Sequence, residues 1–213
     1  MVRSTIDAFK AQVKADFARP NLFEVKLRFP GALDLGDSAN QLTRLGKFTV
    51  RAANLPSSQM GVIEVPYRGR VLKIAGDRTF EPWTVTIMND TKFSLRGAFE
   101  TWFSAIQANN ENYTSLGTLG DASDETGYFA DMQVSQLSRD SKLSGASASQ
   151  EAGEKSPAIL RKYEFVNVFP SNISAIDLDF GSNDAIEEFT VEFQVQYWKQ
   201  VGTGKDGGGI DED

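Results

Sequence analysis

The sequence predicts a mainly β protein: an antiparallel β-sandwich or barrel with one packed α-helix and a short N-terminal helix. Three observations lead to this prediction. Segments of alternating apolar and polar residues recur along the chain, and the clearest is EFTVEFQVQYW at 188–198. One long segment, 92–108, has the apolar spacing of a helix instead. Apolar residues make up 40% of the 213 residues, which is enough for a sizeable core.

The N-terminal segment 4–16 predicts a short amphipathic helix. Ile6, Phe9 and Val13 are spaced i, i+3 and i+7, which places them on one helical face. Pro20 excludes the helical conformation for the residue before it and ends this segment.

Several strands are expected in the first half of the chain. Segments 21–29 and 48–55 alternate apolar and polar residues, and the stretch 30–46 between them predicts a loop. Segment 62–76 reads either as two short strands around Tyr67-Arg68-Gly69 or as one long bent ribbon.

The stretch AGDRTFEPWTVTIMND, residues 75–90, predicts a polar turn, then a strand, then the start of a helix. Trp83, Val85 and Ile87 alternate with threonines and should anchor the strand in the core. Asp90 or Thr91 can cap the following helix by accepting backbone N–H groups. The apolar stripe of that helix comprises Leu95, Phe99, Trp102 and Ile106.

The second half adds four predicted strands and completes a single domain, 1–198. The stretch 138–157 is rich in Ser, Ala and Gly and is expected to be a mobile loop, because it has too few apolar residues to offset its ordering entropy. The glycine-rich acidic end, 199–213, is expected to be a flexible tail. The four strands are 129–137, 159–169, 173–180 and 188–198, and 109–127 is a long loop.

The absence of histidine and cysteine excludes most familiar catalytic and metal sites. A Ser-His-Asp triad, a cysteine nucleophile and a zinc finger all need one of these residues. Asp177-x-Asp179-x-Gly181 faintly resembles a calcium loop, but its glycine lies one position too early, so a polar turn is the better interpretation. The chain is therefore not expected to be an enzyme, to bind a cofactor or to hold a metal ion.

The charge is unevenly distributed. Residues 1–110 carry 15 Lys/Arg and 10 Asp/Glu, whereas residues 111–213 carry 7 and 19. This pattern fits either a solvated surface with an acidic end or subunits that stack basic surface against acidic surface. The net charge of −7 argues against a protein that grips DNA phosphates. We expect synthesis and assembly in a cytoplasm, since the sequence lacks a membrane-span or signal-peptide pattern.

Three stretches, in order, resemble the tail tube proteins of contractile-tailed bacteriophages. They are DFARPNLFEV at 16–25, AGDRTFEPWTVTIMND at 75–90 and FPSNISAIDLDFGSNDAIEEFTVEFQVQYW at 169–198. The resemblance implies that six subunits form a ring, that their sheets join into one β-barrel around a channel, and that rings stack into a tube inside a contractile sheath. It also implies a location in the virion tail, after assembly in the host cytoplasm.

The same resemblance implies the partners and the contact residues. The partners would be other copies of the chain and the tail sheath, tape measure, baseplate and tail terminator proteins, while viral DNA would pass through the lumen without specific binding. An acidic wall would repel the passing genome. Contacts between subunits and rings are expected at Arg19, Pro20, Asn21, Gly76, Asp77, Arg78, Thr79 and Phe80.

Other functions stay open at this point. The chain could form the tube of a genome-free contractile injection particle, whose sequence pattern is similar. It could also be a monomeric ligand-binding β-sandwich for carbohydrate or peptide, which predicts a concave cluster of surface aromatic residues. An acid/base hydrolase has no support, because adjacent Glu187 and Glu188 would point to opposite faces of a strand.

Overall fold

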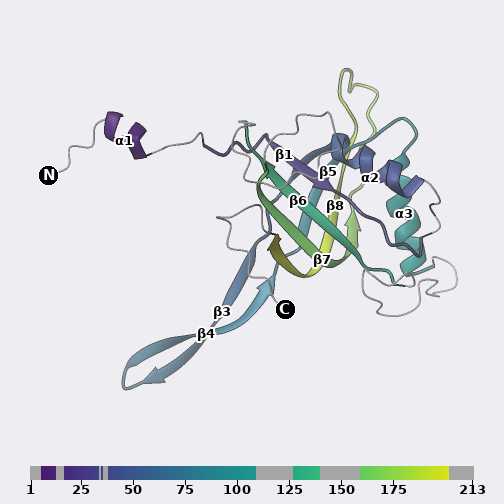
Figure 1. Ribbon diagram of the computed structural model, residues 1–213. Helices are drawn as coiled ribbons and strands as arrows, with labels where there is room; N and C mark the ends of the chain where they lie inside the picture. The colour runs from purple at the N-terminus through teal and green to yellow at the C-terminus, as the bar shows by residue number, and fades with distance from the viewer. Residues whose placement is uncertain are drawn as a thin grey trace. The chain divides into compact units, whose positions relative to one another are not determined.

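The computed structural model describes residues 6–12, 17–33, 35, 38–108, 127–139 and 159–201 (Figure 1). The chain divides into two compact units. The larger unit contains Val25–Val134 and Tyr163–Val201, and the smaller contains Met1–Glu24, Ser135–Lys162 and Gly202–Asp213. No helix among the described residues is long and apolar enough to cross a membrane.

The described residues form a six-stranded sheet in the order β1-β6-β7-β8-β5-β2 and a separate two-stranded sheet, β3-β4. Strand β5 pairs antiparallel with both β2 and β8, and β3 pairs antiparallel with β4. The larger sheet is barrel-like and nearly closed, which confirms the predicted fold class. The elements are α1 (Ile6–Gln12), β1 (Phe23–Lys26), α2 (Ser38–Thr49), β2 (Val50–Ala53), β3 (Ser58–Tyr67), β4 (Arg70–Phe80), β5 (Trp83–Met88), α3 (Ser94–Ile106), β6 (Ala130–Leu137), β7 (Ile159–Ile173) and β8 (Glu188–Val201).

The core begins with directly opposed apolar pairs on β5 and β8. Because successive side chains of a strand alternate between faces, the odd-numbered residues of both strands point to the same side. The pairs are Trp83 with Phe193, Val85 with Val191 and Ile87 with Phe189, and all six side chains are buried. The Trp83 indole N–H donates to the Asn54 carbonyl at 2.7 Å, so its polar atom is also satisfied.

Helix α3 supplies the other layer of this core. Phe99 is fully buried, and its ring lies 5.2 Å from that of Phe29 and 5.8 Å from that of Phe193. The buried Trp102 indole donates to the Tyr128 carbonyl at 2.9 Å. The predicted apolar stripe is confirmed for Leu95, Phe99 and Trp102, so these side chains serve packing and not a ligand site.

Asp90 holds the start of α3. Its carboxylate accepts hydrogen bonds from the Ser94 backbone N–H at 2.8 Å and from the Ser94 hydroxyl at 2.7 Å. Partial burial acts to raise the pKa of Asp90, but the hydrogen bonds from Ser94 outweigh it, and the pKa lies below its usual value. The predicted cap is therefore Asp90, and the helix begins at Ser94, two residues after the expected start.

Asp90→Ala should destabilise the protein by about 1 kcal/mol at neutral pH, because it leaves helix N–H groups without an acceptor. Since the folded pKa is depressed, the stabilisation is complete above the unfolded pKa of about 3.9 and is lost as the pH falls through the folded pKa. Urea unfolding at pH 7 and near pH 3 measures this directly. A stability difference between wild type and Asp90→Ala that does not shrink in acid would contradict the role of the carboxylate.

We predicted a loop at 30–46 and a strand at 48–55, and helix α2 corrects both predictions. Residues Ser38–Thr49 form a helix that buries Leu42 and Gly46, and the strand that follows is Val50–Ala53. A Cβ added at Gly46 would lie 3.2 Å from Leu27 Cδ1, so at this glycine the helix closely approaches the residue that follows β1. Phe48, the first residue of the predicted strand, lies in this helix instead, and its side chain is exposed.

The prediction of a strand at 173–180 was also wrong. After Ile173 the chain forms a long irregular loop up to Glu187, in which Leu178 and Phe180 are exposed. The predicted N-terminal helix is present as α1, but Ile6 and Phe9 are exposed and do not enter a core. The expected loop 109–127, the mobile stretch 138–157 and the acidic tail lie almost entirely outside the described residues.

Candidate assembly interface

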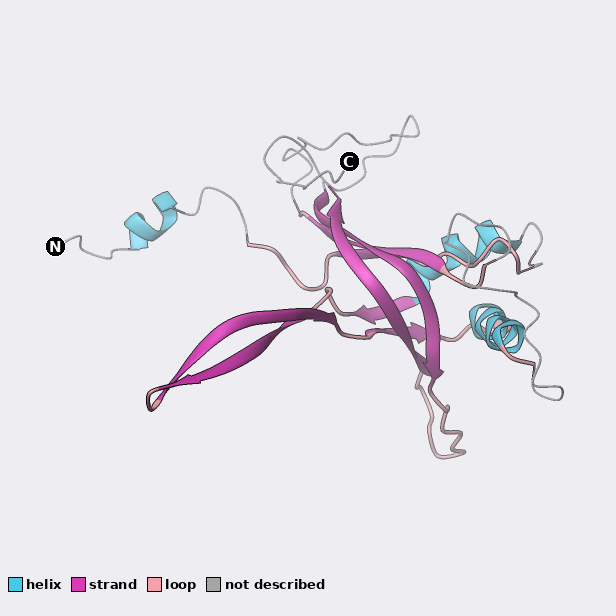
Figure 2. Ribbon diagram, turned by 90° about the horizontal axis from the view of Figure 1, so that it is seen from below, coloured by secondary structure: helices cyan, strands magenta, loops and turns pink. Residues whose placement is uncertain are grey.

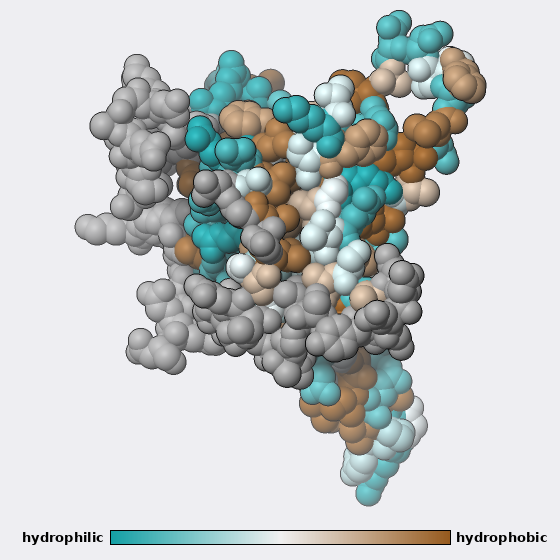
Figure 3. Space-filling view, turned by 90° about the vertical axis from the view of Figure 1, so that its right-hand side faces the viewer, coloured by the Kyte–Doolittle hydropathy of each residue, from teal (hydrophilic) through white to brown (hydrophobic). Residues whose placement is uncertain are grey.

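The hairpin β3-β4 carries a large apolar surface that its own chain leaves open. Figure 2 draws it as a long twisted ribbon, and Figure 3 shows apolar patches along it. Every residue of β3 is exposed, and so are nine of the eleven residues of β4. Arg68 and Gly69 both have positive φ angles, 46° and 81°, which is typical of a two-residue type I′ turn. The structure thus confirms the reading of two strands around this turn.

Both faces of the hairpin carry apolar residues, but they differ in charge. Directly opposed residues share a face, so the register assigns each side chain to one side. We call Ile63, Val65, Tyr67, Leu72 and Ile74 the apolar hairpin face, and these side chains are between 40% and 66% exposed. Arg70, opposite Tyr67, lies on the same side at the end of the hairpin. The other face also exposes Val62 and Val71, but there Lys73 Nζ lies 3.7 Å from Glu64 Oε1, and this ion pair suits a surface in contact with water. The apolar hairpin face is therefore the side that needs a partner.

A bulge near the base of the hairpin replaces the turn that was predicted at AGDRTF. The register shifts between Met60 and Val62, where Gly61 faces Gly76 and Asp77. A Cβ on Gly76 would lie 3.2 Å from the Gly61 backbone, and one on Gly61 would lie 3.1 Å from the Asp77 carbonyl oxygen. Both glycines are thus required by close backbone approach, and residues 76–80 belong to β4.

Arg78 fastens the base of the hairpin to the larger sheet. Its guanidinium carbon lies 4.8 Å from the ring centroid of Phe80 and 4.9 Å from that of Trp198 on β8. Its Nη2 also donates to the Ser58 hydroxyl at 3.1 Å. Arg78 was predicted to contact another subunit, but within the chain it fixes the point from which the hairpin extends.

The other predicted contact group, Arg19-Pro20-Asn21, forms an exposed turn in the smaller unit. The Leu22 N–H donates to the Arg19 carbonyl at 3.2 Å and closes the turn. Gln136 Nε2 donates to the carbonyls of both Arg19 and Leu22 at 2.7 Å, which holds the turn on β6. The backbone is therefore fixed while the three side chains face outward.

Sequence reasoning found the base of the hairpin but missed its most exposed surface. The residues of the apolar hairpin face alternate along 62–76, and that alternation was taken only as a sign of strands. One signal could have revealed this surface. Apolar residues occupy both faces of the two strands around the Arg68-Gly69 turn, and no third strand among the described residues pairs with them in register. Trp198 was likewise assigned only to the predicted strand 188–198 and not to the base of the hairpin.

Among the described residues, no group of three or more Asp or Glu side chains is placed to hold a metal ion. The acidic turn at Asp177–Gly181 forms a local hydrogen bond instead, from the Gly181 N–H to Asp179 Oδ1 at 2.9 Å.

Comparison with known proteins agrees with the resemblance seen in the sequence. A family model described as "Phage tail tube protein" matches residues 18–201. Tail tube protein gp19 of Enterobacteria phage T4 is 31% identical over 193 residues, which are 91% of this chain and 98% of that protein. The tail tube protein of Serratia phage KSP90 is 24% identical over 200 residues, or 93% and 97% of the two chains.

Two solved structures share the fold. A chain in the sheath-tube complex of the extracellular contractile injection system PVC has a TM-score of 0.52 and 15% identity, over 91% of this chain and 97% of that chain. A chain of the anti-feeding prophage cap has a TM-score of 0.54 and 16% identity, over 89% and 93%. At these identities the likeness concerns the fold alone.

Proposed function

Because this chain belongs to the phage tail tube protein family, which is structural and not enzymatic, we propose that its copies form rings that stack into the hollow tube of a contractile phage tail. Family membership confirms the predicted resemblance and the predicted location in the virion tail. The main observation that supports the proposal is the exposure of the apolar hairpin face in the single chain.

Assembly gives this hairpin the partner it lacks. A two-stranded ribbon alone is marginally stable in water, and its outer edges present unpaired N–H and C=O groups. If the hairpin lies against the sheet of a neighbouring copy, both the apolar side chains and these backbone groups are satisfied. The wall of the channel would then be one β-barrel to which every copy contributes.

The partners follow from the same assignment. The tube would associate with the sheath and the baseplate. We also propose that it encloses a tape measure protein and ends at a terminator protein. The 31% identity to phage tail tube proteins favours this role over a genome-free injection particle and over a monomeric sugar- or peptide-binding sandwich. We further propose that DNA passes without specific binding because an acidic wall repels it, which a lumen lined mainly by Lys and Arg would contradict.

Electron microscopy of the purified wild-type chain tests the proposal. Negative staining at increasing protein concentration, with and without isolated baseplates as nuclei, should show rings and hollow rods. A chain that stays monomeric under all of these conditions would overturn it.

Arg78→Ala should weaken assembly while leaving the fold intact. The substitution removes the guanidinium between Phe80 and Trp198, an interaction of about 0.5–2 kcal/mol, so the concentration needed for rods should rise about 2- to 30-fold. Sedimentation of rods against concentration measures this. Arg44→Ala, which removes an exposed arginine on α2, is the matched control. Normal rods from Arg78→Ala would show that this contact does not matter for assembly.

A further inference from the structure

The loop between β7 and β8, residues 174–187, is acidic and exposes apolar side chains. It contains Asp177, Asp179, Asp184 and Glu187 and has no Lys or Arg. Leu178 is 86% exposed, and Phe180 is fully exposed. A side chain as large as Phe180, held in solvent among carboxylates, is typical of a contact surface and not of a plain connection.

Local hydrogen bonds give this 174–187 loop a defined shape. Asp179 Oδ1 accepts from the Gly181 N–H at 2.9 Å, and the Asp179 carbonyl accepts from the Ser182 N–H at 3.1 Å. The Asn183 N–H donates to the Gly181 carbonyl at 3.1 Å. Phe180 therefore lies at a turn whose backbone is fixed on both sides, so little ordering entropy is lost when it binds.

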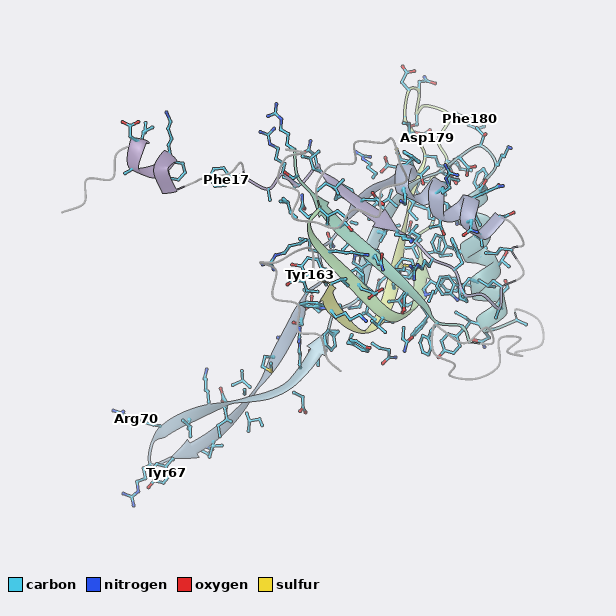
Figure 4. The ribbon with its side chains drawn as sticks, in the orientation of Figure 1. Phe17, Tyr67, Arg70, Tyr163, Asp179 and Phe180 are labelled. Atoms are coloured by element: carbon cyan, nitrogen blue, oxygen red, sulfur yellow. The ribbon has the colours of Figure 1, made fainter. Side chains whose placement is uncertain are left out.

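The tip of the β3-β4 hairpin has the complementary chemistry. We define the hairpin tip as residues 67–72, which include Arg68 and Arg70 and no acidic residue. Tyr67, Arg68, Arg70, Val71 and Leu72 line a shallow, mainly apolar hollow. Among the described residues, neither arginine forms an ion pair, and neither do Asp177, Asp179 and Asp184 of the loop. Figure 4 labels Tyr67 and Arg70 on the hairpin and Asp179 and Phe180 on the loop.

These two surfaces cannot meet within one chain. The loop ends where β8 begins at Glu188, whereas the base of the hairpin contacts Trp198 on the same strand. Ten residues of strand at about 3.3 Å each separate these points by about 33 Å. The hairpin then extends from its base for the length of an 11-residue strand. The larger unit thus carries an acidic apolar surface at one end and a basic apolar surface at the other.

We propose that the 174–187 loop of one copy binds the hairpin tip of another copy, with Phe180 in the hollow and Asp177 and Asp179 facing Arg68 and Arg70. The occupant of the hollow is a second copy of this chain, because the chain itself supplies the complementary charge and the exposed aromatic side chain. Such a contact is heterologous: each copy uses different surfaces toward its two neighbours, so it can either close a ring or continue from ring to ring along a tube. This inference rests on the proposed function and names the two surfaces, the 174–187 loop and the hairpin tip, through which copies would contact each other in the tube.

Cysteine cross-linking tests this contact without background, since the chain contains no cysteine. In the variant with both Arg70→Cys and Asp179→Cys, assembled particles treated with a short bis-maleimide should give a ladder of dimers, trimers and longer products on a denaturing gel. Either single-cysteine variant should give no ladder. Particles of the double variant that assemble normally but give no ladder would overturn the contact and leave the tube function intact. Complete absence of wild-type polymer would overturn both.

A charge exchange provides an independent readout. Arg70→Glu should raise the concentration needed for rods by about tenfold or more, and Asp179→Arg should do the same, because each places like charges together. The combined variant should recover most of the loss. Arg44→Glu, the same charge change on exposed α2, should have no comparable effect. Equal losses in the single and combined variants would contradict a direct contact between these residues.

Discussion

Replacing Ile63 with Lys and Ile74 with Glu should abolish tube assembly and leave the monomer folded. The two side chains oppose each other on the apolar hairpin face and are about half exposed in the single chain. The new Lys and Glu can pair across the strands and preserve the hairpin. Full burial of an exposed isoleucine is worth about 1.5–3 kcal/mol, and each of these side chains has about half of its surface left to bury. Loss of both should therefore weaken each contact by about 1.5–3 kcal/mol, on the order of 10–10² in its equilibrium constant, and this loss recurs at every contact of the tube.

The hairpin offers a matched control one position away. Val62 and Ala75 also oppose each other, but on the face that carries the Glu64–Lys73 ion pair. Val62→Lys with Ala75→Glu makes the same charge change and should reduce assembly far less. Sedimentation gives the polymer fraction, and circular dichroism verifies the fold. If the two double variants assemble equally well, the apolar hairpin face is not the buried surface.

Phe99→Ala should produce the largest loss of stability of any change considered, about 3–5 kcal/mol. The Phe99 ring is fully buried, and it contacts rings on both β8 and α3 as well as Phe29. Its removal leaves a cavity between the helix and the sheet that neighbouring aromatic rings cannot fill without moving. A loss of this size is a large fraction of the about 5–15 kcal/mol that stabilises a typical domain.

Equilibrium unfolding in guanidinium chloride measures this loss, and Phe48→Ala is the control. Phe48 is the same residue type but is 80% exposed on α2, so its removal should change the free energy of unfolding by less than about 0.5 kcal/mol. Similar losses for the two variants would mean that α3 does not pack on the sheet as described.

The parts of the fold with strong periodicity were predicted well from the sequence. Strands β5 and β8 and helix α3 each show many apolar residues at one spacing, and burial of one face leaves little choice of structure. Helix α2 was missed because its buried stripe consists of Leu42 and a glycine, too short a signal to outweigh the polar residues around it. The strand expected at 173–180 failed for the opposite reason. Ile176, Leu178 and Phe180 alternate like strand residues, but no strand among the described residues covers Leu178 and Phe180.

The candidate interface shows a similar limit. The alternation around Arg68-Gly69 allowed two interpretations, two strands around a turn or one bent ribbon, and the structure shows the first of them. Whether an apolar strand face lies in the core or on the surface depends on strand order, and that is set by distant residues. Arg78 was selected by resemblance alone, and its position between Phe80 and Trp198 joins residues 120 apart in the sequence. Such a contact leaves no periodic signal.

A helical reconstruction of the assembled rods by electron cryomicroscopy tests the central claim most directly. We predict that Ile63, Val65 and Ile74, the part of the apolar hairpin face below the hairpin tip, lie against the sheet of a neighbour in every copy. We also predict that the strands of successive copies form one continuous wall around an open channel. A map in which this face points into solvent, while each copy keeps a separate sheet that no neighbour joins, would contradict the claim.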